Sequence, residues 1–166
     1  ISDLWNRHII DSAQVFTCIS PKTGLWMDVG SGGGFPGIVV SIIAKELAPD
    51  LRTVLVECDN RKCVFLRTAI RELGLSAKVV NDRIENVVFP DVLYLSARAL
   101  SNLNNLLFMV ENNVSRETVC IFPKGRSHKK ELAESQKNWK FDLRAIESNT
   151  SEEGKIIVLR GLERVN

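Results

Sequence analysis

The chain has 166 residues, of which 45% are hydrophobic and 25% are charged, and its formal net charge is +2. This composition is ordinary for one folded globular domain, and it excludes a disordered, collagen-like or coiled-coil protein. No apolar run reaches the roughly 18 residues that a membrane-spanning helix needs, so we expect no membrane partner. The weak positive charge is compatible with a nucleic-acid partner but does not require one.

Helical and strand-like segments alternate along the chain. In chain order, apolar spacing and turn signals predict a helix over 4–16, a strand over 25–29, a helix over 37–47, a strand over 53–58, a helix over 60–73, strands over 77–80 and 91–96, a helix over 103–110, a strand over 118–122, a helix over 127–137, and strands over 141–146 and 155–159. This alternation predicts an α/β fold with a mostly parallel seven-stranded sheet, a C-terminal antiparallel hairpin and helices on both faces. In such sheets ligands bind beyond the carboxyl ends of the strands.

A glycine-rich segment, DVGSGGGFPG at 28–37, connects the first predicted strand to the next helix. Five glycines within eight positions weaken a fold unless a bound molecule needs the bare backbone, and the helix N-terminus adds N–H donors. The spacing of Gly32, Gly34 and Gly37 matches the dinucleotide fingerprint. Asp28 is foreign to that fingerprint, and its carboxylate could accept hydrogen bonds from a ligand's ammonium group, directly or through water.

Acidic residues follow the second and third predicted strands. Glu57 directly follows the strand residues 54–56, where an acid can bind both hydroxyls of a ribose. Asp59 is the less favoured alternative for this role. After the third strand, Asp82 and Glu85 have the spacing of a helix capping box, and the stretch from Ile84 to Glu85 could also line an adenine ring.

Basic residues follow the last two parallel strands. Arg98 comes after the fourth strand, on the same side of the sheet as the glycine-rich segment. Lys124 begins a basic run after the fifth strand and is its best candidate for a site, because it lies closest to the strand end. Lys129 and Lys130 fit a solvated helix face equally well.

The four cysteines have no metal-ligand spacing, so we expect no metal site. Cys58, Cys63 and Cys120 lie in apolar runs, which favours small buried side chains in a reducing cytoplasm.

The segment 28–37 resembles the glycine motif of the RsmG (GidB) family of methyltransferases. The resemblance runs from Trp5 to about Leu159. Further matching motifs lie at 7–12, 57, 61–66, 83–85, 96–99 and 124–125.

The resemblance implies a Rossmann-like class I methyltransferase fold and transfer of a methyl group from S-adenosylmethionine to N7 of a guanine in 16S ribosomal RNA. It also implies a bacterial cytoplasmic enzyme that acts on the small ribosomal subunit, and we expect a monomer. The family has a further N-terminal helical segment, so residues 1–166 are expected to be one methyltransferase domain that lacks it.

Residue roles follow from the resemblance as well. The implied cofactor positions are Gly30, Gly32, Phe35, Glu57, Ile84, Glu85 and Arg98. From their positive charge around the crevice rather than from the resemblance, the basic residues expected to contact RNA are Arg61, Lys62, Lys124, Arg126, Lys129 and Lys130. Guanine N7 carries a lone pair and no proton, so no general base is needed and Arg98 would act by positioning. The alternatives are an NAD(P)-dependent oxidoreductase and a non-enzymatic RNA-binding module.

Overall fold

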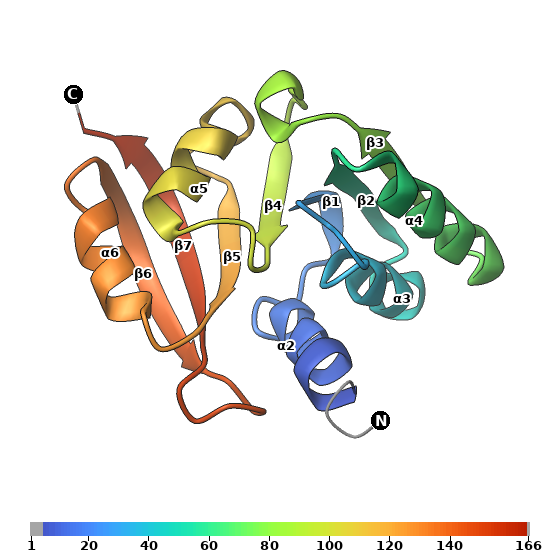
Figure 1. Ribbon diagram of the computed structural model, residues 1–166, viewed down its shortest axis with the longest axis horizontal. Coiled ribbons are helices and arrows are strands. Elements are labelled where there is room, and N and C mark those ends of the chain that lie inside the picture. Colours follow the sequence, from blue (N-terminus) through green and yellow to red (C-terminus); the bar gives the residue numbers. More distant parts are fainter. Residues whose placement is uncertain (1–4, 166) are drawn as a thin grey trace.

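Seven strands form one sheet, in the order β3-β2-β1-β4-β5-β7-β6, in the computed structural model, which describes residues 5–165 (Figure 1). The strands are β1 (Thr23–Val29), β2 (Asp50–Glu57), β3 (Ala77–Asn81), β4 (Val92–Ala97), β5 (Val119–Lys124), β6 (Trp139–Glu147) and β7 (Lys155–Arg164). Strand β7 runs antiparallel to both neighbours, and the other described pairs are parallel. The predicted mostly parallel sheet with a closing antiparallel hairpin is confirmed.

Helices cover both faces of the sheet. They are α2 (Asp11–Thr17), α3 (Gly37–Leu47), α4 (Asn60–Glu72), α5 (Leu103–Val110) and α6 (His128–Ser135). Helices α2, α3 and α4 pack on the face that carries Trp26 and Leu55, whereas α5 and α6 pack on the face that carries Met27. Figure 1 shows β3 and α4 at one end of the molecule and β6 with α6 at the other.

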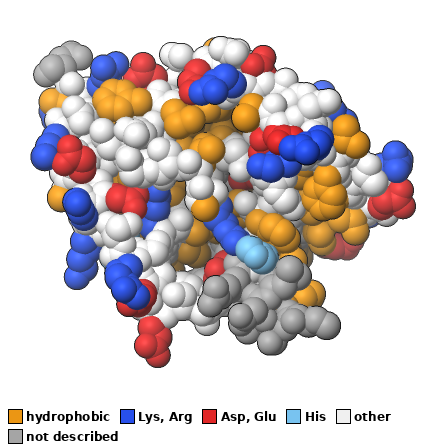
Figure 2. Space-filling view, viewed as in Figure 1, with side chains coloured by type: hydrophobic (Ala, Val, Ile, Leu, Met, Phe, Trp, Pro, Cys, Tyr) orange, Lys and Arg blue, Asp and Glu red, His pale blue; other side chains and the backbone are white. Residues whose placement is uncertain are grey.

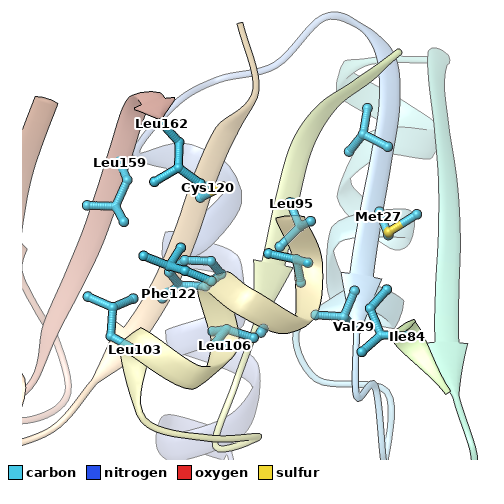
Figure 3. Close-up of a cluster of buried hydrophobic side chains, with 14 of the residues drawn as sticks. Met27, Val29, Ile84, Leu95, Leu103, Leu106, Cys120, Phe122, Leu159 and Leu162 are labelled. Carbon is cyan, nitrogen blue, oxygen red and sulfur yellow. The ribbon is translucent and has the colours of Figure 1, made fainter. Parts of the chain in front are cut away.

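The largest buried cluster lies between the sheet and α5, where Met27, Leu95 and Phe122 face Leu103 and Leu106 (Figure 3). Successive strand side chains point to opposite faces, so alternate residues of the central strands enter this cluster. Burying each large apolar side chain contributes roughly 1.5–3 kcal/mol. The cluster therefore fixes the strand ends from which the site is built.

The first helix and Cys58 differ from the predictions. The predicted first helix is present, but residues Trp5–Ile10 wind as a π-helix before α2 begins. The apolar spacing does not distinguish these windings, and residue 4 lies outside the described chain. Cys58 is exposed, not buried, because it follows the last residue of β2, whereas Cys63 and Cys120 are buried as expected.

The predicted capping box is wrong. Residues Ile84–Asn86 form a single 3₁₀ turn that begins after Arg83. Asp82 accepts from the backbone N–H of Arg83 and from the side chain of Asn86, and Glu85 pairs with Arg83 at 3.2 Å. The reciprocal contacts of a capping box do not form because the turn is too short. Across 5–165, none of the helices has both the length and the apolarity needed to cross a membrane.

Candidate active site

Two cavities open at the carboxyl ends of the parallel strands. The larger cavity, ≈ 500 Å³, lies against the glycine-rich segment and the ends of β2 and β4, and the smaller cavity, ≈ 380 Å³, lies against α2, the end of β5 and the hairpin loop between β6 and β7. Arg98 and Ala99 line both. The φ angle of Ala99 is +52°, a left-handed conformation that is strained for a residue with a Cβ.

The glycine-rich segment closes the larger cavity with backbone atoms. The φ angle of Gly32 is +53°, and a Cβ there would have only the carbonyl oxygen of Gly30 nearby, at 3.7 Å. A Cβ at Gly34 would instead meet Ile38 at 2.5 Å. Gly34 thus permits packing on α3, whereas Gly32 leaves space beside the larger cavity for a bound molecule.

Glu57 holds the loop at the end of β2. Its Oε2 accepts from the N–H of Gly32 at 2.8 Å, and its Oε1 accepts from the N–H of Asp59 at 2.9 Å. A carboxylate has about four acceptor positions, so capacity remains for the two hydroxyls of a ribose. Asp59 does not line the larger cavity: it caps α4 by accepting from the N–H groups of Arg61 and Lys62. These N–H groups, that of Lys62 foremost, lower the pKa of Asp59.

Asp28 lies beneath the loop and is 1% exposed. Its Oδ1 accepts from the hydroxyl of Ser96 at 2.6 Å, and its Oδ2 accepts from the N–H of Gly37 at 3.2 Å. The indole of Trp26 donates to the same Ser96 oxygen at 2.9 Å. Burial raises the pKa of Asp28 to about 6 against the opposing effect of these hydrogen bonds. The carboxylate lines neither cavity and ties α3 to β4, which argues against a direct contact with a ligand's ammonium group. The contact through water stays a prediction.

Arg98 stands between the two cavities. Its Nη2 is hydrogen-bonded to His8 Nδ1, and its guanidinium carbon lies 5.9 Å from the ring centroid of Phe35. The ring of His8 stacks on Phe35 with centroids 5.1 Å apart. Burial lowers the pKa of Arg98, although an arginine remains charged at neutral pH. Its Nη1 is buried and has no hydrogen-bond partner among the described side chains, so it is a donor available to an acceptor on a bound molecule or to water.

Most of the implied cofactor positions lie together. Gly30, Gly32, Glu57, Ile84, Glu85 and Arg98 all line the larger cavity. Phe35 lines neither cavity and instead supports His8 and Arg98 from one side. The larger cavity is also lined by Cys58, Leu100 and Met109, which no sequence motif reveals.

The basic residues expected to contact RNA fall into two groups. Lys124 is not the free cation that the sequence suggested: its ammonium pairs with Glu131 at 2.9 Å and donates to the carbonyl of Ser101, and its side chain is only 11% exposed. The exposed group consists of Arg61, Lys62, Arg126, Lys129 and Lys130. Within it, Lys62 also lines the larger cavity, and Arg126 pairs with Glu153 at 2.7 Å. On the face of the molecule that Figure 2 shows, basic side chains are scattered among acidic ones and form no continuous basic patch.

The chain resembles known proteins in sequence and in fold. Residues 1–161 match the family described as "GidB: rRNA small subunit methyltransferase G". The "Ribosomal RNA small subunit methyltransferase G" of Ruegeria sp. (strain TM1040) is 47% identical over 165 residues, and that of Ruegeria pomeroyi is 44% identical over 165; each alignment covers 99% of this chain and 80% of the relative. A solved "SAM dependent methyltransferase" from Aquifex aeolicus is 12% identical, with a TM-score of 0.70 over 98% of this chain and 93% of its own.

Proposed function

The chain belongs to the rRNA small subunit methyltransferase G family, and from this premise we propose that it transfers the methyl group of S-adenosylmethionine to N7 of a guanine in 16S ribosomal RNA. The observation that carries the proposal is the pair of cavities that meet at Arg98 and Ala99. The larger cavity would hold the cofactor, and the smaller cavity would hold the target base. A nicotinamide oxidoreductase is disfavoured by the family match.

The residues of the larger cavity fit the cofactor. Glu57 has acceptor positions left for the ribose hydroxyls, Gly32 leaves room beside its backbone, and Ile84 offers an apolar contact to the adenine. The unpaired Nη1 of Arg98 would donate to an acceptor of either bound molecule. S-adenosylmethionine, when bound, supplies an electrophilic methyl group on a sulfonium.

The reaction asks for positioning rather than proton transfer. The lone pair of guanine N7 forms the new N–C bond while the S–C bond breaks and its electron pair stays on sulfur. No proton moves, so this chain's residues must hold the two reactants in line and exclude competing water. Arg98 contacts both cavities and is the residue best placed for that alignment. The exposed basic residues Arg61, Lys62, Arg126, Lys129 and Lys130 would bind the RNA backbone.

The test uses the full-length protein, labelled S-adenosylmethionine and small ribosomal subunits from a strain that lacks the enzyme. We expect label on one guanine of 16S RNA, at a site where N7 methylation makes the strand cleavable. In a parallel assay, Arg98→Lys should keep the fold and lose most transfer, because lysine cannot reproduce a guanidinium. Loss of turnover alone would assign Arg98 to the guanine, and a parallel loss of cofactor affinity would assign it to the cofactor. Label on another atom or on protein would refute the proposal.

A further inference from the structure

The smaller cavity has the size and lining of a pocket for one flat polar ring. Its volume of ≈ 380 Å³ lies in the range of roughly 300–1,000 Å³ that is typical of small-ligand sites. Pro123 and Ile156 supply apolar lining, and Arg98 supplies a charged donor at the junction with the larger cavity. Such a combination suits a base removed from its stack, which needs apolar contact on its faces and hydrogen bonds at its edges.

Two carboxylates line this cavity, and they differ in how many of their acceptor positions are occupied by hydrogen bonds within the protein. Glu131 pairs with Lys124, accepts from the hydroxyl of Ser127, and accepts from the N–H of Leu103 at 2.9 Å. Asp11 uses Oδ1, which accepts from the hydroxyls of the hairpin loop. Among the side chains that the structure describes, none donates to Asp11 Oδ2. Asp11 is thus the carboxylate of the smaller cavity with acceptor capacity left for a ligand.

The order of these groups matches one edge of guanine. From N7 the edge runs to O6, an acceptor, and then to N1–H and the N2 amino group, both donors. Arg98 belongs to both cavities, and Asp11 belongs to the smaller cavity alone. With N7 at the junction, O6 would meet the unpaired Nη1 of Arg98, and the two donors would lie farther inside the smaller cavity.

We propose that Asp11 selects guanine by accepting hydrogen bonds from N1–H and the N2 amino group of the target base, while Arg98 donates to O6. This inference rests on the proposed function. Adenine would place its N6 amino group against the guanidinium and its N1 acceptor against the carboxylate, so both contacts would be repulsive. Leaving buried polar groups unpaired in this way is what gives a site strong discrimination.

The experiment measures binding of GMP, IMP and AMP to the protein saturated with S-adenosylhomocysteine. We expect GMP to bind at least about tenfold more tightly than AMP, and IMP, which lacks the N2 amino group, to fall between them. Asp11→Asn keeps an oxygen for the loop hydroxyls and replaces the free acceptor with a donor. It should lower the ratio of the GMP affinity to the AMP affinity by about tenfold or more without changing the affinity for S-adenosylhomocysteine.

Glu152→Gln is the matched control, because Glu152 is an exposed carboxylate of the hairpin loop that Asp11 contacts, and it should leave the ratio unchanged. An unchanged ratio in Asp11→Asn would overturn the inference. Equal binding of GMP and IMP by the wild type would also overturn it, even if the variant did not fold. These binding measurements need no turnover, so a wild-type protein that prefers GMP but fails to methylate small subunits would refute the proposed function and leave the base preference standing.

Discussion

Two acidic residues near the end of β2 have different roles, although they are only two positions apart. Glu57 is 6% exposed and binds the glycine-rich segment, whereas Asp59 caps α4. Glu57→Ala should therefore weaken S-adenosylmethionine by about tenfold to a hundredfold, because the ribose loses its acceptor and the loop is released. Asp59→Ala should lower the stability, because α4 loses its N-cap, and leave the affinity nearly unchanged. Calorimetry on both variants separates the roles, and the reverse pattern would place the ribose at Asp59.

Asp28 makes stability depend on pH in an unusual direction. Its carboxyl has a pKa of about 6 in the folded protein, above the ordinary value of 3.8. The folded state therefore holds the proton more tightly than the unfolded state, so stability falls as the pH rises from about 4 to above 6. The difference in free energy of unfolding between the wild type and Asp28→Asn should shrink by roughly 2–3 kcal/mol over that interval. Urea unfolding at each pH measures it, and a constant difference would contradict the assignment.

At the scale of elements, Lys124 and Glu131 connect the end of β5 to α6, and both side chains are mostly buried. Lys129 and Lys130 lie on the exposed face of the same helix. Replacing both exposed lysines with glutamine should weaken RNA binding and flatten the slope of log K against log salt by roughly 0.7–0.9 for each phosphate that the protein no longer neutralises. Cofactor affinity should not change.

Lys124→Met provides the comparison for that variant. It should cost roughly 3 kcal/mol of stability, because it leaves the charge of Glu131 unpaired, and it should leave the salt slope unchanged. A flatter slope of log K against log salt in Lys124→Met would show that Lys124 does contact RNA. No change in the double lysine variant would identify that face as merely solvated.

The regular elements could be predicted because their signals are local. Helices α3 and α5 have the predicted bounds of 37–47 and 103–110, since apolar spacing and turn residues mark both ends. Strand β7 extends to Arg164, well beyond the predicted 155–159, and β6 begins at Trp139 and ends at Glu147, slightly beyond the predicted 141–146. The exposed side chains of β6, which lies at the edge of the sheet, hide its length from any count of apolar residues.

The arrangement of side chains within the site could not be predicted in the same way. The sequence places Asp28 at a strand end but does not show that Ser96, from another strand, encloses its carboxylate. The sequence shows Lys124 only as a cation that follows a strand, and it does not show that Glu131 pairs with it. Asp11 meets the hairpin loop only because the fold brings the first helix and the last hairpin together.

At the scale of the whole molecule, the larger cavity gathers backbone from the glycine-rich segment, the turn Ile84–Asn86 and the segment after β4. A ligand there should protect all three regions at once. At a hundred times its dissociation constant, S-adenosylhomocysteine should add about 2.7 kcal/mol of stability, which corresponds to a rise in Tm of about 5–10 °C.

Hydrogen exchange followed by mass spectrometry locates that protection. Hydrogen exchange in the three cavity regions should slow when S-adenosylhomocysteine binds, whereas exchange in the exposed strand β6 should be unaffected. NADH serves as the control ligand: it should neither raise the Tm nor slow hydrogen exchange in these regions. Slowing confined to one region, or equal stabilisation by NADH, would contradict this description of the larger cavity.

The hydrogen bond from the Trp26 indole to Ser96 gives the molecule an optical reporter. Trp26 is fully buried, stacks on Tyr94, and is one hydroxyl away from the Asp28 carboxylate. Ionisation of that carboxylate changes the electric field at the indole, and therefore the wavelength of its fluorescence. With Trp5 and Trp139 replaced by phenylalanine, the emission of this single tryptophan would follow the titration beneath the glycine-rich segment in real time, without any added dye.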